Sequence, residues 1–121
     1  MIVTELTPVL RTWDIPGTVA FYRDVLGFEV LTHEAHWAML RLDEVRVMLS
    51  GPNAHEGDVR PAFTGSLYFR VTDAGAVWER VHNEARVCYP IEDFEYGMRE
   101  FGIYDNNGYL LQFGQDLQQE G

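Results

Sequence analysis

The chain has 121 residues, 46% of them hydrophobic and 13% aromatic, which is enough for one domain with a substantial core. Nineteen acidic against nine basic residues give a formal net charge of −10, which argues against nucleic acid or membrane surfaces as partners. No stretch approaches the ~20 consecutive apolar residues of a membrane span, and the N-terminus does not resemble a signal peptide. We therefore expect a cytoplasmic protein.

The first half of the chain predicts a strand, a helix and three further strands. Asp14 follows the first strand and can cap a helix, Pro16 suits the first helical turn, and Gly27 can end the helix. Further strands are predicted at residues 28–32, 37–42 and 45–49. These elements make one βαβββ unit.

The second half repeats this order. An offset of 59 residues places Asp14 on Asp73, and each aspartate stands between a strand and a helix. Strands are predicted at residues 67–71, 86–89, 99–104 and 109–113. The sequence thus predicts an α+β fold of two modules in a single domain, residues 1–50 and 65–121, joined by a Pro- and Gly-containing linker at residues 51–64.

Alternation along the strands predicts which side chains face the core. In the first hairpin, one face is entirely apolar and should pack on the helix: Ala38, Leu40, Leu42, Val45, Val47 and Leu49. In the last hairpin an apolar face also forms if the Asn-Gly loop contains a one-residue bulge: Phe101, Ile103, Tyr109, Leu111 and Phe113.

The opposite strand faces mix polar groups with large apolar ones. They could be the solvated outer sides of antiparallel sheets, yet they carry more large apolar groups than a solvent-exposed sheet face usually does. A shared, partly apolar cleft with a few polar groups is typical of a ligand site. The candidate cleft residues are Trp37, Met39, Arg41, Arg46, Met48, Ser66, Tyr68, Glu100, Tyr104, Leu110 and Gln112.

Recognisable catalytic machinery is missing from the sequence. Cys88, the single cysteine, lies in an apolar run and is predicted to be an inert core residue. His33, Glu34 and His36 lack the helical spacing of a zinc motif and are predicted to lie on the surface. We assign no catalytic residue from motifs.

Four segments resemble the vicinal oxygen chelate superfamily of glyoxalases, bleomycin-resistance proteins and extradiol dioxygenases. They are residues 9–14, residues 21–28 with the sequence Phe-Tyr-Arg-Asp-Val-Leu-Gly-Phe, residues 96–101 and residues 105–113. The resemblance implies paired βαβββ modules that form a cupped, U-shaped mixed sheet with helices on its outer face. It also implies a homodimer whose subunits complete one another's clefts.

The resemblance also allows a test for a metal. Metal-using members carry His, Gln or Glu on the first strand of each module and a carboxylate on the last. The matching positions are Thr7, Met48, Ser66 and Gln112. Neutral oxygens and a thioether would hold a hard divalent cation weakly, so we expect neither a metal nor a cofactor.

The bleomycin-resistance branch of the superfamily implies a protein that sequesters a drug or natural product without catalysis. Trp37 and Tyr104 would stack on a planar ligand, Met39 and Met48 would fit an irregular surface, and Glu100 would hold a cationic group. Alternatively, Trp37 belongs to a dimer core, the methionines pack ordinarily, and Glu100 pairs with an arginine.

Two further alternatives stay open. An anionic ligand is favoured if the arginines on the predicted cleft faces are not neutralised by acids: Arg11, Arg41, Arg46 and Arg70. The second alternative is a superfamily enzyme acting on a small metabolite with a non-standard or absent metal site, in which Glu100 is a general base and Tyr104 positions the substrate.

Overall fold

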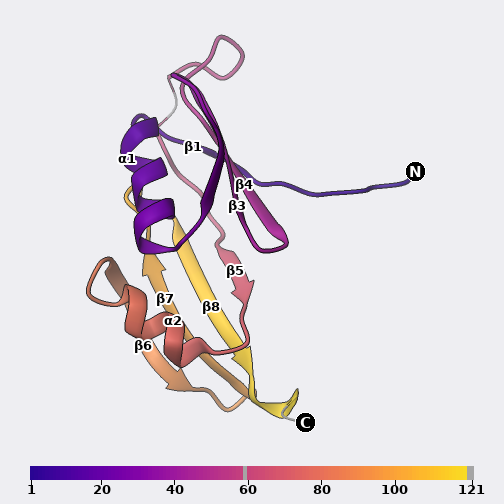
Figure 1. Cartoon of the computed structure of the whole chain (residues 1–121), viewed down its shortest axis with the longest axis vertical. Helices are drawn as coiled ribbons and strands as arrows, with labels where there is room; N and C mark the ends of the chain where they lie inside the picture. Colours follow the sequence, from indigo (N-terminus) through magenta and orange to yellow (C-terminus); the bar gives the residue numbers. More distant parts are fainter. Residues whose placement is uncertain (59, 120–121) are drawn as a thin grey trace. The chain divides into compact units, whose positions relative to one another are not determined.

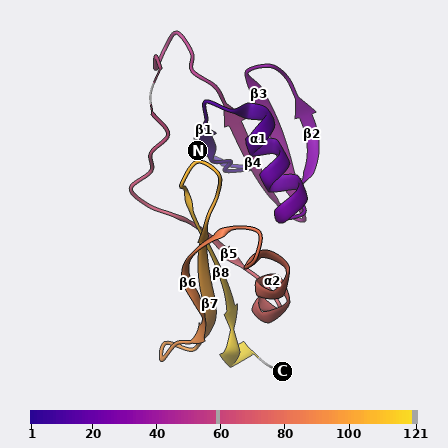
Figure 2. The same ribbon diagram turned by 90° about the vertical axis from the view of Figure 1, so that its left-hand side faces the viewer.

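The chain folds as two units, Met1–Ala62 and Phe63–Gly121, in a computed structural model that describes residues 1–58 and 60–119. Each unit contains a strand, a helix and three further strands in that order, as Figures 1 and 2 show. The predicted α+β fold of two βαβββ modules is confirmed. Within the described residues, no helix is both long and apolar enough to cross a bilayer.

The first unit is a mixed sheet with one helix. Its elements are β1 (Val9–Arg11), α1 (Ile15–Ala20), η1 (Phe21–Val25), β2 (Glu29–His33), β3 (Trp37–Leu42) and β4 (Val45–Ser50). The strand order is β1-β4-β3-β2, in which β1 runs parallel to β4 and the other neighbours are antiparallel. The helix lies along one face of this sheet (Figure 2).

Local capping explains where the first helix begins. The Asp14 side chain accepts a hydrogen bond of 3.0 Å from the backbone N–H of Gly17, and Pro16 lies in the first turn. The α-helical hydrogen bonds give way to a π-helical turn, η1, and Gly27 follows with a φ of 87°. The apolar residues at helical spacing are all buried: Ile15, Val19, Tyr22 and Leu26.

The first hairpin has the predicted register, with Leu42 opposite Val45 across a two-residue turn. Most of its apolar face lies in the core: Ala38, Leu40, Val47 and Leu49. Val45 is 44% exposed, so the expectation that it packs in the core is wrong. It flanks the turn at the hairpin tip, where the core does not cover it.

The second unit repeats the arrangement. Its elements are β5 (Leu67–Arg70), α2 (Ala74–Val81), β6 (Arg86–Asp93), β7 (Met98–Tyr104), β8 (Leu110–Asp116) and η2 (Leu117–Gln119). The strand order is β5-β8-β7-β6, and α2 packs against β6, β7 and β8 (Figure 1). The Asp73 side chain accepts a hydrogen bond of 3.1 Å from Ala76 N–H, so it caps α2 as Asp14 caps α1. The predicted repeat is confirmed at these caps.

The last hairpin has the register that places its predicted apolar residues on one face, with Phe101 opposite Phe113 and Ile103 opposite Leu111. Tyr104 pairs with Leu110, and the loop between them turns through Gly108, whose φ is 87°. The buried Asp105 side chain accepts hydrogen bonds from the N–H groups of Asn107 at 2.8 Å and Tyr109 at 3.0 Å. The predicted apolar face is consequently buried: Phe101, Ile103, Tyr109, Leu111 and Phe113.

Strand β6 departs from the sequence prediction. It continues past Tyr89 to Asp93, and its pairing with β7 shifts register on either side of Tyr89. Pro90 is tolerated because β6 is the edge strand of its sheet. Cys88 is exposed, so the prediction of a buried cysteine is wrong: the alternating side chains of an edge strand turn it toward solvent.

Between β4 and β5 the chain is irregular. Among the described residues 51–58 and 60–66 there is no helix or named strand, only an isolated bridge between Asn53 and Gly57. This segment belongs to the Pro- and Gly-containing stretch that the sequence assigns to a linker.

Candidate functional site

In the first unit, the strand face opposite the core carries five of the candidate residues. Met39 on β3 pairs with Met48 on β4, and Arg41 pairs with Arg46. Trp37 begins β3 on the same face and is half-buried, as are both methionines. The structure therefore brings an aromatic ring, two thioethers and two guanidinium groups onto one partly exposed surface.

The arginines of the candidate faces are neutralised by acids. Arg41 donates to Glu29 at 2.7 Å, and the Arg46 guanidinium lies 3.7 Å from a Glu5 oxygen. In the second unit Arg70 lies 3.7 Å from an Asp116 oxygen. Such partly exposed pairs add little to stability, but they cancel the positive charge that an anionic ligand would need.

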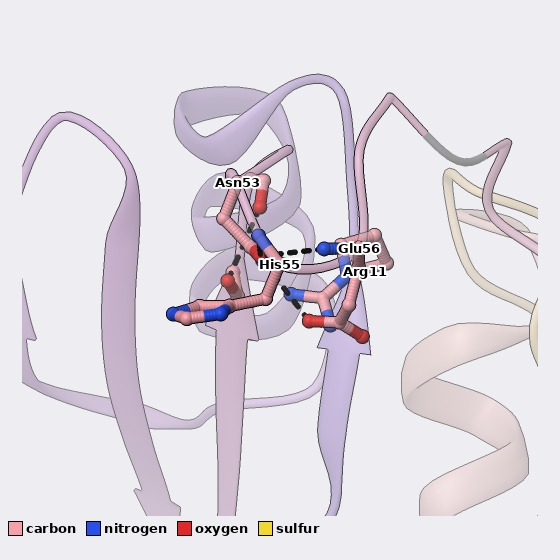
Figure 3. A network of polar contacts seen from close by, with 6 residues as sticks. Arg11, Asn53, His55 and Glu56 are labelled. Atoms are coloured by element: carbon pink, nitrogen blue, oxygen red, sulfur yellow. Dashed lines mark hydrogen bonds and ion pairs between the residues drawn. The ribbon is translucent and has the colours of Figure 1, made fainter.

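Arg11 is held by the segment that follows β4, as Figure 3 shows. It pairs with Glu56, and its side chain is only 17% exposed. The Asn53 side-chain oxygen accepts hydrogen bonds from the N–H groups of His55 at 3.0 Å and Glu56 at 3.1 Å, and its amide donates to Glu56 at 3.0 Å. The bond from Asn53, and after it Arg11, keeps the pKa of Glu56 below its usual value. All four arginines thus have acidic partners.

In the second unit, a buried carboxylate is held by three phenols. Glu100 on β7 is 5% exposed and accepts hydrogen bonds from the hydroxyls of Tyr68 at 2.7 Å, Tyr89 at 2.5 Å and Tyr96 at 3.1 Å. These donors come from β5, from β6 and from the turn before β7. Among the described residues Glu100 has no ion-pair partner, so the alternative in which it pairs with an arginine is wrong.

The network continues to two positions that the superfamily resemblance identified. Gln112 donates to the Tyr89 hydroxyl at 3.0 Å, and Ser66 donates to the Gln112 side-chain oxygen at 2.5 Å. Ser66, Gln112, Tyr89 and Glu100 therefore form one chain of hydrogen bonds, which runs from the residue before β5 through β8 and β6 to β7. We call the residues Ser66, Tyr68, Tyr89, Tyr96, Glu100 and Gln112 the tyrosine–glutamate cluster.

Two glycines make room for this cluster. A β-carbon at Gly102 would overlap the Tyr89 ring, and one at Gly114 would overlap the Tyr68 hydroxyl. Gly114 is paired with Glu100 in the β7–β8 ladder, so the missing side chain lets Tyr68 reach the carboxylate over the sheet surface.

The surroundings keep the phenols protonated. Burial, and after it the hydrogen bond to Glu100, raises the pKa of Tyr68 to about 12. The same two causes raise the pKa of Tyr89, against a smaller opposing effect of Gln112. At neutral pH both hydroxyls therefore remain donors to the carboxylate.

Tyr104 and Leu110 lie on the same face but outside the cluster. The Tyr104 hydroxyl donates to the Cys88 sulfur at 3.1 Å, which is the main cause of a raised Tyr104 pKa. The Arg86 guanidinium carbon lies 4.2 Å from the centre of the Tyr104 ring and covers one of its faces. A planar ligand could therefore stack only on the other face of this ring.

Sequence reasoning missed three aromatic residues near Glu100. Tyr89 and Tyr96 belong to the cluster, and Phe94 stacks on Tyr96 with ring centres 5.4 Å apart and planes inclined by 3°. Phe94 also meets Tyr89 edge to face at 6.0 Å. The density of aromatic residues between positions 89 and 96 was the available signal, but the register shifts of β6 hid which residues of β7 they would face.

The residues at the superfamily metal positions do not fit a hard divalent cation. Thr7 donates to Glu5 at 3.0 Å, Ser66 and Gln112 bind each other, and Met48 offers a thioether. These groups are neutral, and three of them are engaged in hydrogen bonds. In the part of the chain that the structure describes, no three His, Cys, Asp or Glu residues cluster in a way that could hold a metal ion. His33 and His36 are exposed, as expected.

Paired βαβββ units with this strand order define the class of fold, and comparison with known families identifies its family. The model of the glyoxalase/bleomycin resistance protein/dioxygenase superfamily matches residues 5–113. The chain belongs to this superfamily, as its sequence motifs predicted.

Individual relatives are similar over nearly the whole chain. A bleomycin resistance protein from Geobacillus stearothermophilus is 28% identical over 129 aligned residues, which cover 91% of this chain and 95% of the relative. The bleomycin-binding protein of Streptomyces verticillus, solved with copper(II)-bleomycin, is 26% identical with a TM-score of 0.70 and coverage of 93% and 96%. A superfamily protein from Nocardioides, 16% identical, superposes with a TM-score of 0.78 over 100% of this chain and 88% of that one, and shows the shared fold.

Proposed function

We propose that this protein binds and sequesters a small-molecule drug or natural product and thereby confers antibiotic resistance. The observation that carries the proposal is the similarity to bleomycin resistance proteins over 91% of the chain. It is supported by residues at the superfamily metal positions that suit hydrogen bonding within the protein better than metal chemistry. Fold alone would not suffice, because this superfamily hosts many activities.

The first unit offers a surface for a planar or aromatic part of the ligand. Trp37, Met39 and Met48 are half-buried on one strand face, and their neighbours Arg41 and Arg46 are neutralised by Glu29 and Glu5. An indole ring flanked by polarisable thioethers favours stacking on a flat, weakly polar surface.

The structure gives less support to the enzymatic alternative. A general base needs a lone pair that the substrate can reach, yet Glu100 is 5% exposed and its oxygens already accept three phenol hydrogen bonds. Tyr104, the group expected to position the substrate, donates its hydroxyl to Cys88. Sequestration therefore needs fewer rearrangements than catalysis at these residues.

We further propose that the protein acts as a homodimer. Its N-terminal segment carries apolar side chains that the single chain leaves in solvent, with Ile2 91%, Val3 69% and Leu6 86% exposed. Contiguous exposed apolar groups favour burial against a second copy. Sedimentation equilibrium should give twice the chain mass, and removal of residues 1–6 should weaken self-association; a monomer at micromolar concentration would contradict this part of the proposal.

The function is tested by drug protection in a bacterial host. Cells expressing the protein should survive bleomycin concentrations that kill control cells, and Trp37→Ala should abolish protection without unfolding the protein. Trp13→Ala is the matched control, since Trp13 is 58% exposed and lies outside the candidate face. Protection that survives Trp37→Ala would exclude the stacking role, and the absence of any protection by the wild-type protein would contradict the function.

A further inference from the structure

We infer that the surface formed by Tyr68, Phe94 and Tyr96 above Glu100 is a subsite for an organic cation, such as a quaternary ammonium or a guanidinium group. The inference rests on the proposed function, because it names the chemistry of one group that the sequestered ligand would carry. It depends on three features: a buried negative charge, exposed aromatic surface and a local excess of carboxylates.

The negative charge is buried without a counter-ion. Glu100 is 5% exposed, and its hydrogen-bond partners among the described residues are three phenol hydroxyls. Phenol donors satisfy the hydrogen-bonding capacity of a carboxylate but leave its net charge in place. A cation that approaches the cluster therefore meets an uncompensated negative charge in a site of low dielectric.

Two of the aromatic rings that bind the carboxylate are themselves exposed at the surface. Tyr68 is 45% exposed and Tyr96 is 58% exposed, and both donate their hydroxyls to Glu100. A phenol that donates to an anion becomes richer in electrons, which strengthens the attraction of its ring face for a cation. Phe94 stacks on Tyr96 at 5.4 Å and meets Tyr89 at 6.0 Å, so the rings support one another.

The charged residues around the cluster also favour a cationic ligand. Residues 92–100 contain four carboxylates and one guanidinium, and that guanidinium, on Arg99, donates two hydrogen bonds to Asp93, at 2.6 and 3.0 Å. Glu92 pairs with Glu100 in the β6–β7 ladder and helps to raise the pKa of Tyr96. Arg70, the cation that acts on Tyr68, is paired with Asp116. This part of the second unit therefore attracts cations and repels anions.

Choline and its neutral isostere 3,3-dimethylbutan-1-ol provide the test. The two probes have almost the same shape and differ in the positive charge. Titration of the wild-type protein, followed by the NMR resonances of the tyrosine rings, should give saturable shifts with choline below about 100 mM and none with the alcohol. Equal responses to both probes, or no saturable response to choline, would overturn the inference.

Variants locate the site. Tyr96→Ala removes an exposed ring and should weaken choline binding at least about fivefold, as should Glu100→Gln, which removes the charge and keeps the shape. Glu79→Gln, at an exposed position on α2 outside the cluster, should leave choline affinity unchanged. If Glu100→Gln fails to fold, Tyr96→Ala still decides, because its side chain adds little to the core. Unchanged affinity in Tyr96→Ala would overturn the inference.

The outcome is separable from that of the proposed function, because choline binding is measured without a drug. Choline binding by a protein that fails to bind bleomycin would support the subsite and contradict the proposed function. Bleomycin binding by a protein that ignores choline would support the function and overturn the subsite.

Discussion

Tyr89 on the edge strand β6 donates a hydrogen bond of 2.5 Å to Glu100 on the neighbouring strand β7. The same Tyr89 hydroxyl accepts a bond from Gln112 on β8, so one phenol connects three strands. A buried carboxylate without such donors would cost several kcal/mol in desolvation, roughly the whole margin of a small domain. The phenols therefore allow this sheet face to keep a negative charge.

Loss of the Tyr89 hydroxyl should destabilise the protein. Tyr89→Phe deprives Glu100 of a donor and Gln112 of an acceptor, and we expect the free energy of unfolding to fall by about 1–3 kcal/mol in urea titrations. Tyr104→Phe is the matched control: within the described part of the chain its hydroxyl bonds only to the sulfur of an exposed cysteine, so the change should stay within about 0.5 kcal/mol. Equal losses of unfolding free energy in the two variants would contradict a specific stabilising role of the hydrogen bonds around Glu100.

Stability should also fall at alkaline pH. The folded chain keeps the Tyr68 proton up to a pKa of about 12, whereas an unfolded tyrosine releases it near 10.0. The stabilisation that this proton represents is complete below pH 10 and is lost as the pH rises toward 12. The chain contains no lysine, so the groups whose ordinary pKa lies in this window are mainly its six tyrosines, and a comparison with Tyr68→Phe isolates Tyr68.

The measurement for this prediction compares wild type with Tyr68→Phe by urea unfolding between pH 8 and pH 12. Below pH 10 the difference in unfolding free energy contains the Tyr68 contribution, and it should shrink as the pH rises through the range set by the shifted pKa. A difference that stays constant or grows with pH would contradict the assigned direction of the pKa shift.

The helix caps provide a prediction for each repeat. Asp73→Ala removes the acceptor for Ala76 N–H and should lower the free energy of unfolding by about 1 kcal/mol. Asp73→Asn keeps a capping oxygen and should cost less, and Asp14→Ala should resemble Asp73→Ala because Asp14 binds Gly17 N–H in the same way. Thermal or urea unfolding of the three variants checks this. An Asn variant as unstable as the Ala variant would assign the effect to charge instead of capping.

Much of the fold was predictable because local rules agree with the final packing. Asp14 and Asp73 mark helix starts by capping chemistry, and strict alternation places Leu40 and Leu111 in the core. Alternation also placed Glu100 and Gln112 on one face of the β7–β8 hairpin, where the ladder confirms them. These predictions needed only the period of a strand and the type of a turn.

The contents of the site were less predictable. Side chains of β6 alternate between exposed and half-buried, but its pairing with β7 shifts register on either side of Tyr89, so the sequence could not predict which β7 residues Tyr89 would face. The sequence left two partners open for Glu100, a cationic ligand group or an arginine, and did not predict its hydrogen bonds with residues 68, 89 and 96, which depend on tertiary contacts. The arginines pair with other acids: Arg11, for example, pairs with Glu56, which the sequence assigns to the linker.

The most direct test of the central claim is a calorimetric titration of the purified protein with bleomycin, both metal-free and copper(II)-loaded. We expect saturable binding with a dissociation constant of about 1 µM or tighter, and a marked loss of affinity in Trp37→Ala but not in Trp13→Ala. No heat of binding with either form of the drug, from a protein shown to be folded, would contradict the proposal that this chain is a bleomycin-type sequestration protein.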